Sequence, residues 1–164
     1  MNENYIVING KKIELTEEQL KQLGIESEKK NPFERLDKYD CYYYITEYGN
    51  VDDHAEEGDC SDQALYDGVN YFNNKDFAEQ VALHQLLYRK LLKFSYDNEC
   101  EDDKWNNLNY HWHIFYNHID DCFDVQGNNG FKFQSVHFKS QVCAERAIKE
   151  VVEPFMKEHP DFVW

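Results

Sequence analysis

The sequence contains no uninterrupted apolar run of the roughly 20 residues that a membrane-spanning helix needs. Its first residues, MNENYIVING, also lack the basic and apolar regions of a signal peptide, so we expect a cytoplasmic protein. Mean hydropathy is only -0.83, but aromatic residues make up 16% of the chain, which is too many for a disordered protein. The 164 residues suffice for one domain with a real core.

Cysteine pairs of the C-x-x-C type are absent too. The chain has five cysteines, an odd number, and they are scattered along its length: Cys41, Cys60, Cys100, Cys122 and Cys143. Such a pattern argues against a disulfide framework and against a zinc ribbon. We expect all five to be reduced thiols.

Local signatures of catalysis are missing, since the chain has no P-loop, Rossmann glycine pattern, G-x-S-x-G or Cys-His motif. The chain is therefore predicted not to be an enzyme and to need no cofactor. Adjacent acids such as Asp52 and Asp53 could hold Mg²⁺ or exchange protons, but neighbouring carboxylates on a loop are usually only solvated. A metal-dependent hydrolase that acts through Asp102 or Asp121 is the least favoured alternative.

One cluster has the residue types that bind zinc, namely His111, His113 and His118 with Asp120, Asp121 and Cys122 nearby. His111 and His113 share one face of a predicted strand, whereas His118 lies beyond its end. No H-E-x-x-H spacing supports the cluster. We predict surface or sheet-packing histidines and no metal site.

Basic residues are scarce: 17 Lys and Arg stand against 32 Asp and Glu, which gives a net charge of -15. This sign opposes direct binding to nucleic acid or to an anionic membrane, and it favours a basic protein partner or serves solubility alone. B-DNA carries one negative charge per about 1.7 Å of its axis, so carboxylates on a rigid edge could occupy a basic nucleic-acid channel. The candidate partner-binding residues form two clusters, Glu47, Asp52, Asp53, Glu56, Glu57, Asp59 and Asp62 in the first and Asp97, Glu99, Glu101, Asp102 and Asp103 in the second.

The strongest helical pattern runs from Asn74 to about Asn98. Its apolar residues recur at helical steps and form a broad stripe. Asn74 is a good N-cap, Asp76 lies in the first turn and Lys93 lies late, an order that suits the helix dipole. We expect the rest of the chain to be organised around this helix.

The remaining pattern predicts an α+β fold in two parts. Residues 1–30 form a ββα appendage, with a hairpin about Asn9-Gly10 and a short helix that Thr16 and Gln19 cap. Residues 31–164 form the main domain, an antiparallel sheet with two main helices on one face. The second helix follows Ser140 and is kinked or restarted at Pro154. Strands are expected at 42–46, from 51, and at 110–116, 122–125 and 131–138, with an acidic, mobile or outward-facing loop at 47–62.

Two segments of the chain resemble each other. FNNKDFAE begins at Phe72 and FKSQVCAE begins at Phe138, and both read F-x-[N/S]-x-x-x-A-E. An aromatic hairpin precedes each segment, so the domain can be interpreted as two related strand-hairpin-helix halves. The alternative is that any strand-to-helix junction reads this way, and both interpretations stay open.

The motifs NPFER (31–35), YYYI (42–45), G-x-V (49–51), NYF (70–72) and VHF-x-S (136–140), with Ala78-Glu79 and Trp105, resemble a group of small uncharacterised acidic proteins of phages and prophages of Gram-positive bacteria. The likeness covers residues from about Asn31 to the C-terminus. It implies a viral protein that acts in the bacterial cytoplasm, and it carries over no functional residue.

Our leading functional hypothesis combines this context with the acidic clusters. We expect a non-enzymatic, phage-encoded binding protein that inhibits a host antiviral or nucleic-acid-handling protein, as an anti-CRISPR does, through an acidic face that mimics DNA. The partner would be a basic host protein, and the chain would be a monomer or a homodimer. The alternative is a protein that sequesters a nucleotide signal, which would need a phosphate site built from Arg35, Lys38, Arg89 or Arg146.

Overall fold

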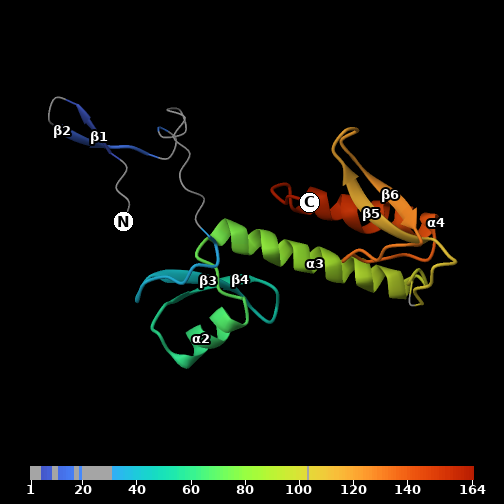
Figure 1. Ribbon diagram of the computed structural model, residues 1–164, viewed down its shortest axis with the longest axis horizontal. Helices are drawn as coiled ribbons and strands as arrows, with labels where there is room; N and C mark the ends of the chain where they lie inside the picture. Colours follow the sequence, from blue (N-terminus) through green and yellow to red (C-terminus); the bar gives the residue numbers. More distant parts are fainter. Residues whose placement is uncertain (1–4, 9–10, 17–18, 20–30, 103) are drawn as a thin grey trace.

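The computed structural model describes residues 5–8, 11–16, 19, 31–102 and 104–164 (Figure 1). It has the predicted α+β class, with antiparallel strands and helices in the order β1 (Tyr5–Ile8), β2 (Lys11–Glu14), β3 (Cys41–Ile45), β4 (Val51–Ala55), α2 (Cys60–Asp67), α3 (Lys75–Asp97), β5 (His111–Asn117), β6 (Cys122–Asn128), α4 (Gln141–Ala147), η1 (Ile148–Val152) and α5 (Glu153–Glu158). The strands pair as separate hairpins, β1–β2, β3–β4 and β5–β6, rather than as the one sheet predicted. Within the described ranges, no helix combines the length and apolar character needed to span a membrane.

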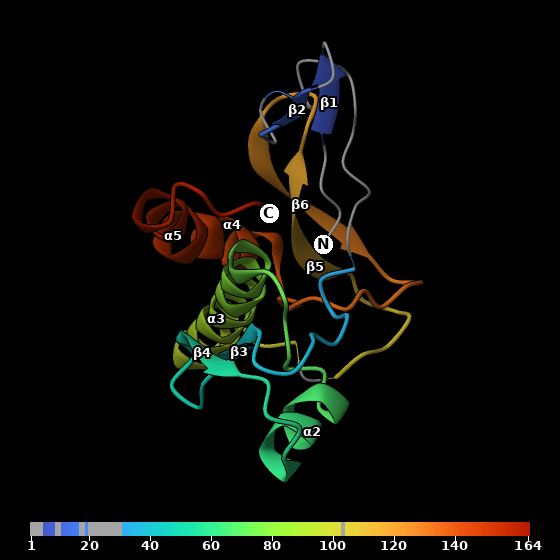
Figure 2. The same cartoon turned by 90° about the vertical axis from the view of Figure 1, so that its left-hand side faces the viewer.

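Helix α3 confirms the prediction for residues 74–98. The Asn74 side chain accepts a hydrogen bond from the Phe77 amide at 2.8 Å, as an N-cap does. Figure 2 looks nearly along α3 and shows β3–β4 on one side of it and the β5–β6 and α4–α5 elements on the other. This one helix therefore packs against both groups of elements. It contacts β3 and β4 of the first group and α4 and η1 of the second.

The β3–β4 hairpin also forms as predicted, with Cys41 opposite Ala55 and Ile45 opposite Val51. Gly49 in its turn has a φ of +87°, and a Cβ there would lie 3.1 Å from Nη2 of Arg89, so both the backbone and the neighbouring guanidinium favour glycine. The predicted acidic loop at 47–62 is wrong, since β4 and the start of α2 occupy this stretch. The missed signal was Asp59 with Asp62, which form a capping box.

Strands β5 and β6 pair from His111 opposite Asn128 to Asn117 opposite Cys122, which confirms the second hairpin. The strand predicted at 131–138 is wrong except at its last residue. Only Phe138 pairs, through backbone hydrogen bonds of 2.7 and 3.0 Å with Trp112. Phe131 and Phe133 are 73% and 47% exposed, so this aromatic run does not have the buried face of a strand.

The last helical segment begins after Ser140, whose hydroxyl accepts a hydrogen bond from the Cys143 amide. Pro154 has no amide hydrogen to donate, and the segment passes through the π-helical turn η1 just before it. There the Glu153 amide bonds to the Ile148 carbonyl five residues back. The predicted interruption at Pro154 is confirmed, and it takes the form of a wider turn.

The main core lies between α3, the inner face of the β5–β6 hairpin and the α4–α5 segment. This arrangement agrees with two principal helices on one face of antiparallel strands. Phe162 in the C-terminal tail is 4% exposed and packs in this core. The core residues include Leu87, Leu91, Phe94, Ile114, Val136, Phe138, Ala144, Ile148, Val152, Phe155 and Phe162.

A disulfide joins Cys100 and Cys143, so the expectation of five reduced thiols is wrong for these two. Cys100 follows α3 and Cys143 lies in the first turn of α4. Packing of the two helices brings their Cα atoms to 5.6 Å, a normal separation for a disulfide. Spacing along the chain could not show this, because 43 residues separate the two cysteines. The three free cysteines of the described part, Cys41, Cys60 and Cys122, are exposed.

The two similar segments occupy corresponding places. Phe72 pairs with Tyr43 of β3 through backbone hydrogen bonds of 2.7 and 2.8 Å, just as Phe138 pairs with Trp112 of β5. Each phenylalanine comes two residues before a helix N-cap, and the alanine six residues further on, Ala78 in the first case, is fully buried in both. Descent of the two halves from one unit stays a prediction.

In the N-terminal part, β1 and β2 form the predicted antiparallel hairpin. Thr16 and Gln19 form the predicted capping box, with a hydrogen bond of 2.9 Å from the Thr16 amide to the Gln19 side chain. The rest of the predicted helix and the Asn9-Gly10 turn lie outside the described residues. The division into 1–30 and 31–164 stays a prediction.

Candidate functional site

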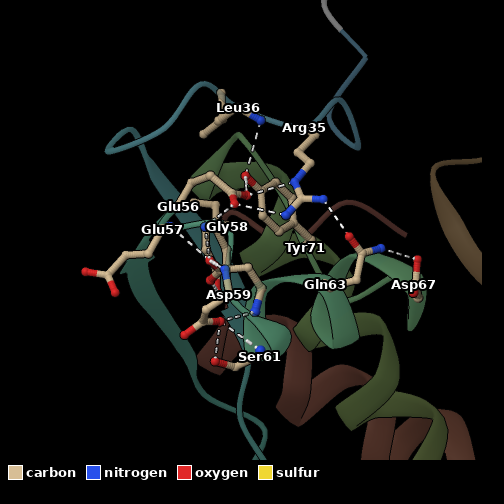
Figure 3. A network of polar contacts seen from close by, with 12 residues as sticks. Arg35, Leu36, Glu56, Glu57, Gly58, Asp59, Ser61, Gln63, Asp67 and Tyr71 are labelled. Carbon is tan, nitrogen blue, oxygen red and sulfur yellow. Dashed lines mark hydrogen bonds and ion pairs between the residues drawn. The ribbon is translucent and has the colours of Figure 1, made fainter.

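Glu56 follows β4 and has a buried carboxylate at the centre of a polar network (Figure 3). Arg35 donates to both of its oxygens, from Nε at 3.1 Å and from Nη2 at 3.0 Å. The Tyr71 hydroxyl and the Gly58 amide each donate a further hydrogen bond at 3.0 Å. A buried charge is tolerated only with partners of this kind, and Glu56 has an opposite charge and two neutral donors.

Asp62, in the first turn of α2, is completely buried and is equally well paired. The Tyr42 hydroxyl donates to Oδ1 at 2.8 Å. The backbone amides of Glu57, Gly58 and Asp59 donate to Oδ2 at 2.9, 2.8 and 3.1 Å. Gly58 has a φ of +78°, which a glycine adopts without strain and which lets three successive amides turn toward one oxygen. The carboxylate therefore holds the loop that joins β4 to α2.

The rings of Tyr42 and Tyr71 connect the two carboxylates. They stack with centroids 4.1 Å apart and an angle of 19° between their planes. The Tyr71 hydroxyl, which donates to Glu56, also accepts a hydrogen bond from the Leu36 amide at 3.2 Å. The network thus fastens the 31–40 segment, β3, the 57–59 loop and α2 to one another.

The network keeps both carboxylates ionised. The Arg35 guanidinium lowers the pKa of Glu56 although burial opposes this. Burial by itself would raise the pKa of Asp62, but the donors from Tyr42 and the loop amides lower it to about 2. Burial and the hydrogen bond to Glu56 raise the pKa of Tyr71 to about 12, so this tyrosine keeps its proton.

Glu56 and Asp62 therefore correct the sequence prediction. Both were candidate partner-binding acids, but their side chains are enclosed and fully engaged with this chain. Charge spacing along the sequence does not distinguish an acid that holds a loop from one that faces solvent. These two residues stabilise the scaffold on which the exposed acids of the first cluster stand.

The other five acids of the first cluster are exposed, and we call them the acidic surface: Glu47, Asp52, Asp53, Glu57 and Asp59. No ion pair joins any of them to a lysine or arginine of the described residues. Asp59 also caps α2. Asp52 and Asp53 are consecutive on β4, so they point to opposite faces of the hairpin. The acidic surface therefore surrounds an edge of the hairpin and is not a flat patch.

The second acidic cluster lies elsewhere, at the C-terminal end of α3. This helix has 23 residues and is about 35 Å long, and the β3–β4 hairpin lies toward its other end (Figure 1). Asp97 pairs with Lys93, Asp102 pairs with His111, and Glu99 is exposed. Glu101 is half-buried, and its Oε2 atom has no hydrogen-bond partner. Asp103 lies outside the described residues. The structure does not gather the two clusters into one surface.

His111 is buried and is held on both sides of its ring. Its Nδ1 bonds to the Asp102 carboxylate, and its Nε2 lies 2.6 Å from the Asn106 carbonyl oxygen. The Asn106 amide nitrogen also lies 3.4 Å from Nε2, so this ring nitrogen faces both the N–H and the carbonyl of one residue. Burial lowers the pKa of His111, but the Asn106 carbonyl and Asp102 raise it more, so the net pKa is above 6.5. The Trp105 ring stacks on the His111 ring with centroids 3.8 Å apart.

His113 and His137 lie near this pair and behave differently. Their ring centroids are 5.9 Å apart, and Nδ1 of His113 and Nε2 of His137 have no hydrogen-bond partner. Burial lowers the pKa of both. His137 was missed from the sequence. The signal was its place beside Phe138, because the pairing of Phe138 with Trp112 turns His137 toward the face of His111 and His113.

The residues considered as zinc ligands and not predicted to bind metal, His111, His113 and His118 with Asp120, Asp121 and Cys122, do not come together. His118 is exposed and packs against Tyr116, whose hydroxyl donates to Asp121. Among the residues that the structure describes, no three His, Cys, Asp or Glu side chains converge on a point where they could hold a metal ion. The cations considered for a nucleotide are likewise dispersed, since Arg35 binds Glu56 and Arg146 binds Glu150, while Arg89 lies on α3.

Comparison of the chain with models of protein families, with curated proteins and with solved structures gave no match, so the function has to be argued from the site itself.

Proposed function

We propose that this chain is a phage-encoded, non-enzymatic binding protein that inhibits a host antiviral or nucleic-acid-handling protein in the bacterial cytoplasm, as an anti-CRISPR does. The acidic surface is the part that contacts the partner, and the partner is a basic protein that normally binds nucleic acid. The observation that carries the proposal is that five exposed carboxylates stand on one small scaffold and form no ion pair with a lysine or arginine of the described residues.

The rigidity of the scaffold supports this function. Glu57 and Asp59 belong to the loop whose amides bind Asp62, and Asp52 and Asp53 belong to a paired strand. Carboxylates that are already positioned lose little conformational entropy when a partner binds. A charged but mobile loop would lose more of its binding energy to ordering.

The shape of the acidic surface suggests what it fits. Its charges project on both faces of β4 and from the adjoining loop. Neighbouring strand residues are about 3.3 Å apart, so the charges are dense enough to follow a row of basic side chains. A basic groove that closes around an edge, as a nucleic-acid channel does, matches this arrangement better than a flat basic surface.

A structural role for the same acids makes a different prediction. Charged residues on an edge strand also prevent pairing with other chains, and β4 is such a strand. In that case, neutral polar replacements would promote self-association and would change no partner affinity. Under our proposal, they weaken partner binding while the chain keeps its oligomeric state.

The test compares two variants that lose the same charge. The first carries Asp52→Asn, Asp53→Asn and Glu57→Gln, and the control carries Glu153→Gln, Glu158→Gln and Asp161→Asn, all exposed positions at the other side of the molecule. The tagged wild type captures partners from host lysate, and a salt step releases a basic nucleic-acid-binding protein. Affinity for the purified partner then falls at least tenfold in the first variant, and it stays near the wild-type value in the control.

Glu56 is not a suitable position for this experiment, because Glu56→Lys would place a cation against Arg35 in a buried site. An empty capture, or equal affinities of the two triple variants, contradicts the proposal. Screening offers a second readout, since binding through exposed charges weakens as salt rises.

A further inference from the structure

A cavity of about 240 Å³ lies between α3 and the segment that leads from β6 to α4. Four of its lining residues, His84, Leu87, Tyr88 and Leu91, follow one another on a single face of α3 at helical spacing. The opposite wall and the floor come from the 134–138 segment, Ile114 of β5 and the Trp164 ring. The acidic surface contributes no residue to this cavity.

The interior of the cavity is apolar and is lined in part by aromatic rings. Leu87, Leu91 and Val136 are buried behind it, while Tyr88 is 48% exposed and marks the open side. Trp164 and Phe138 present aromatic surface, and the Trp164 ring is held edge-on by Phe123 at 4.8 Å. An apolar cavity of roughly 150 Å³ is enough to hold benzene, so this one has room for a body of one or two fused rings.

One residue in the wall of the cavity carries a polar group that lacks a partner. The Ser135 hydroxyl is buried and forms no hydrogen bond, although Ser135 lines the cavity. A buried polar group without a partner costs about 1–3 kcal/mol, so a ligand that bonds to it gains accordingly. This orphaned hydroxyl is a second observation, independent of the cavity, that points to a ligand with a polar atom on its ring edge.

A cation stands next to the open side. His84, Tyr88 and Gln134 also line an adjoining open hollow, and Gln85 and Arg89 complete it. The Arg89 guanidinium forms no hydrogen bond or ion pair with any described residue, and it is placed against the Gly49 turn. In a chain with a net charge of -15, an arginine left without a carboxylate attracts an anionic group.

We propose that this cavity binds a small planar aromatic molecule that carries a carboxylate. The ring enters between Leu91 and Trp164, a polar ring atom bonds to Ser135, and the carboxylate extends to Arg89. A second hydrogen-bond donor, the amide of Gln85, lies in the same hollow. The apolar lining supplies most of the binding energy, and the two polar groups set the orientation of the ligand.

The test uses indole-3-acetate and its neutral analogue indole-3-acetamide, measured by calorimetry and by amide chemical shifts of the labelled full chain. We expect the acid to bind at micromolar to millimolar concentration and to shift signals of residues 84–91, 134–138 and 164. Arg89→Gln weakens binding of the acid about tenfold and leaves the amide unaffected. The matched control Lys90→Gln, at the next exposed cation of α3, changes neither.

A variant that fills the cavity gives a second reading. Leu91→Phe adds a ring to the wall and abolishes binding of both probes. If this core variant fails to fold, the comparison of Arg89→Gln with Lys90→Gln still decides. Absence of binding of both probes at millimolar concentration overturns the proposal. The proposal is also overturned if the amide chemical shifts change only at other residues. It is overturned as well if Arg89→Gln and Lys90→Gln weaken binding of the acid equally.

Discussion

The Tyr42 hydroxyl donates a hydrogen bond of 2.8 Å to the Asp62 carboxylate, and this contact joins β3 to the first turn of α2. Both side chains are completely buried. The same carboxylate holds the three amides of the 57–59 loop, so one residue determines the position of a strand, a loop and a helix. The acids that we propose as the binding surface are displayed by this arrangement.

Removal of the Asp62 carboxylate should destabilise the fold strongly. Asp62→Ala leaves the Tyr42 hydroxyl and three amides without an acceptor, and each such donor costs about 1–3 kcal/mol. We expect the free energy of unfolding to fall by about 3 kcal/mol or more, as measured by urea denaturation. Asp67→Ala on the same helix is the control, because that side chain is exposed, and it should change stability by less than about 0.5 kcal/mol. Similar losses in both variants would contradict the assigned role.

The pKa of Asp62 also predicts how stability depends on acidity. Its folded pKa of about 2 is below the ordinary 3.8, so the ionised carboxylate stabilises the fold above about pH 4. This contribution is lost as the pH falls from about 4 toward 2. Thermal unfolding followed by circular dichroism should show this decline, and Asp62→Asn should flatten it. An unchanged slope in Asp62→Asn would assign the acid sensitivity to other groups.

The stability that His111 contributes should depend on pH in the opposite direction. Its folded pKa is above 6.5, so its charge stabilises the fold fully below pH 6.5, and the stabilisation is lost as the pH rises through the folded pKa. His113 and His137 have lowered pKa values and should titrate below 6.5. Nuclear magnetic resonance titration of the histidine ring protons separates the three. Titration of His111 below its two neighbours would rule out the ion pair with Asp102.

The disulfide makes a prediction about covalent chemistry and stability. Iodoacetamide applied to the unreduced, denatured chain should label Cys41, Cys60 and Cys122 alone, and five cysteines should react after reduction. A bridge that closes a loop of 43 residues stabilises a fold by about 4 kcal/mol in the chain-entropy model. Dithiothreitol should lower the urea midpoint accordingly. Cys60→Ser is the control and should keep the wild-type midpoint, whereas labelling of five cysteines before reduction would exclude the bridge.

Local patterns in the sequence were sufficient for the elements that local physics determines. Asn74, the apolar period after it and the late lysines specify α3 almost to the residue, because a cap and a periodic stripe act within a few turns. The strands at 42–46 and from 51, and the helix that follows Ser140, were found for the same reason. The strand predicted at 131–138 was wrong, because residues of high β propensity form a strand only where a partner strand is present. In this run, only Phe138 has such a partner.

Interactions between distant residues were decided by tertiary structure alone. Asp59 and Asp62 have the same charge and almost the same place in the sequence, yet one is exposed and the other is buried among four donors. Arg35 is paired with an acid 21 residues away, and Cys100 is bonded to a cysteine 43 residues away. The sequence by itself determined the class of fold, the main helix and the excess of acids. Packing decided which acids face solvent, which cations are free and where a cavity remains, because burial and pairing depend on what the folded chain brings together.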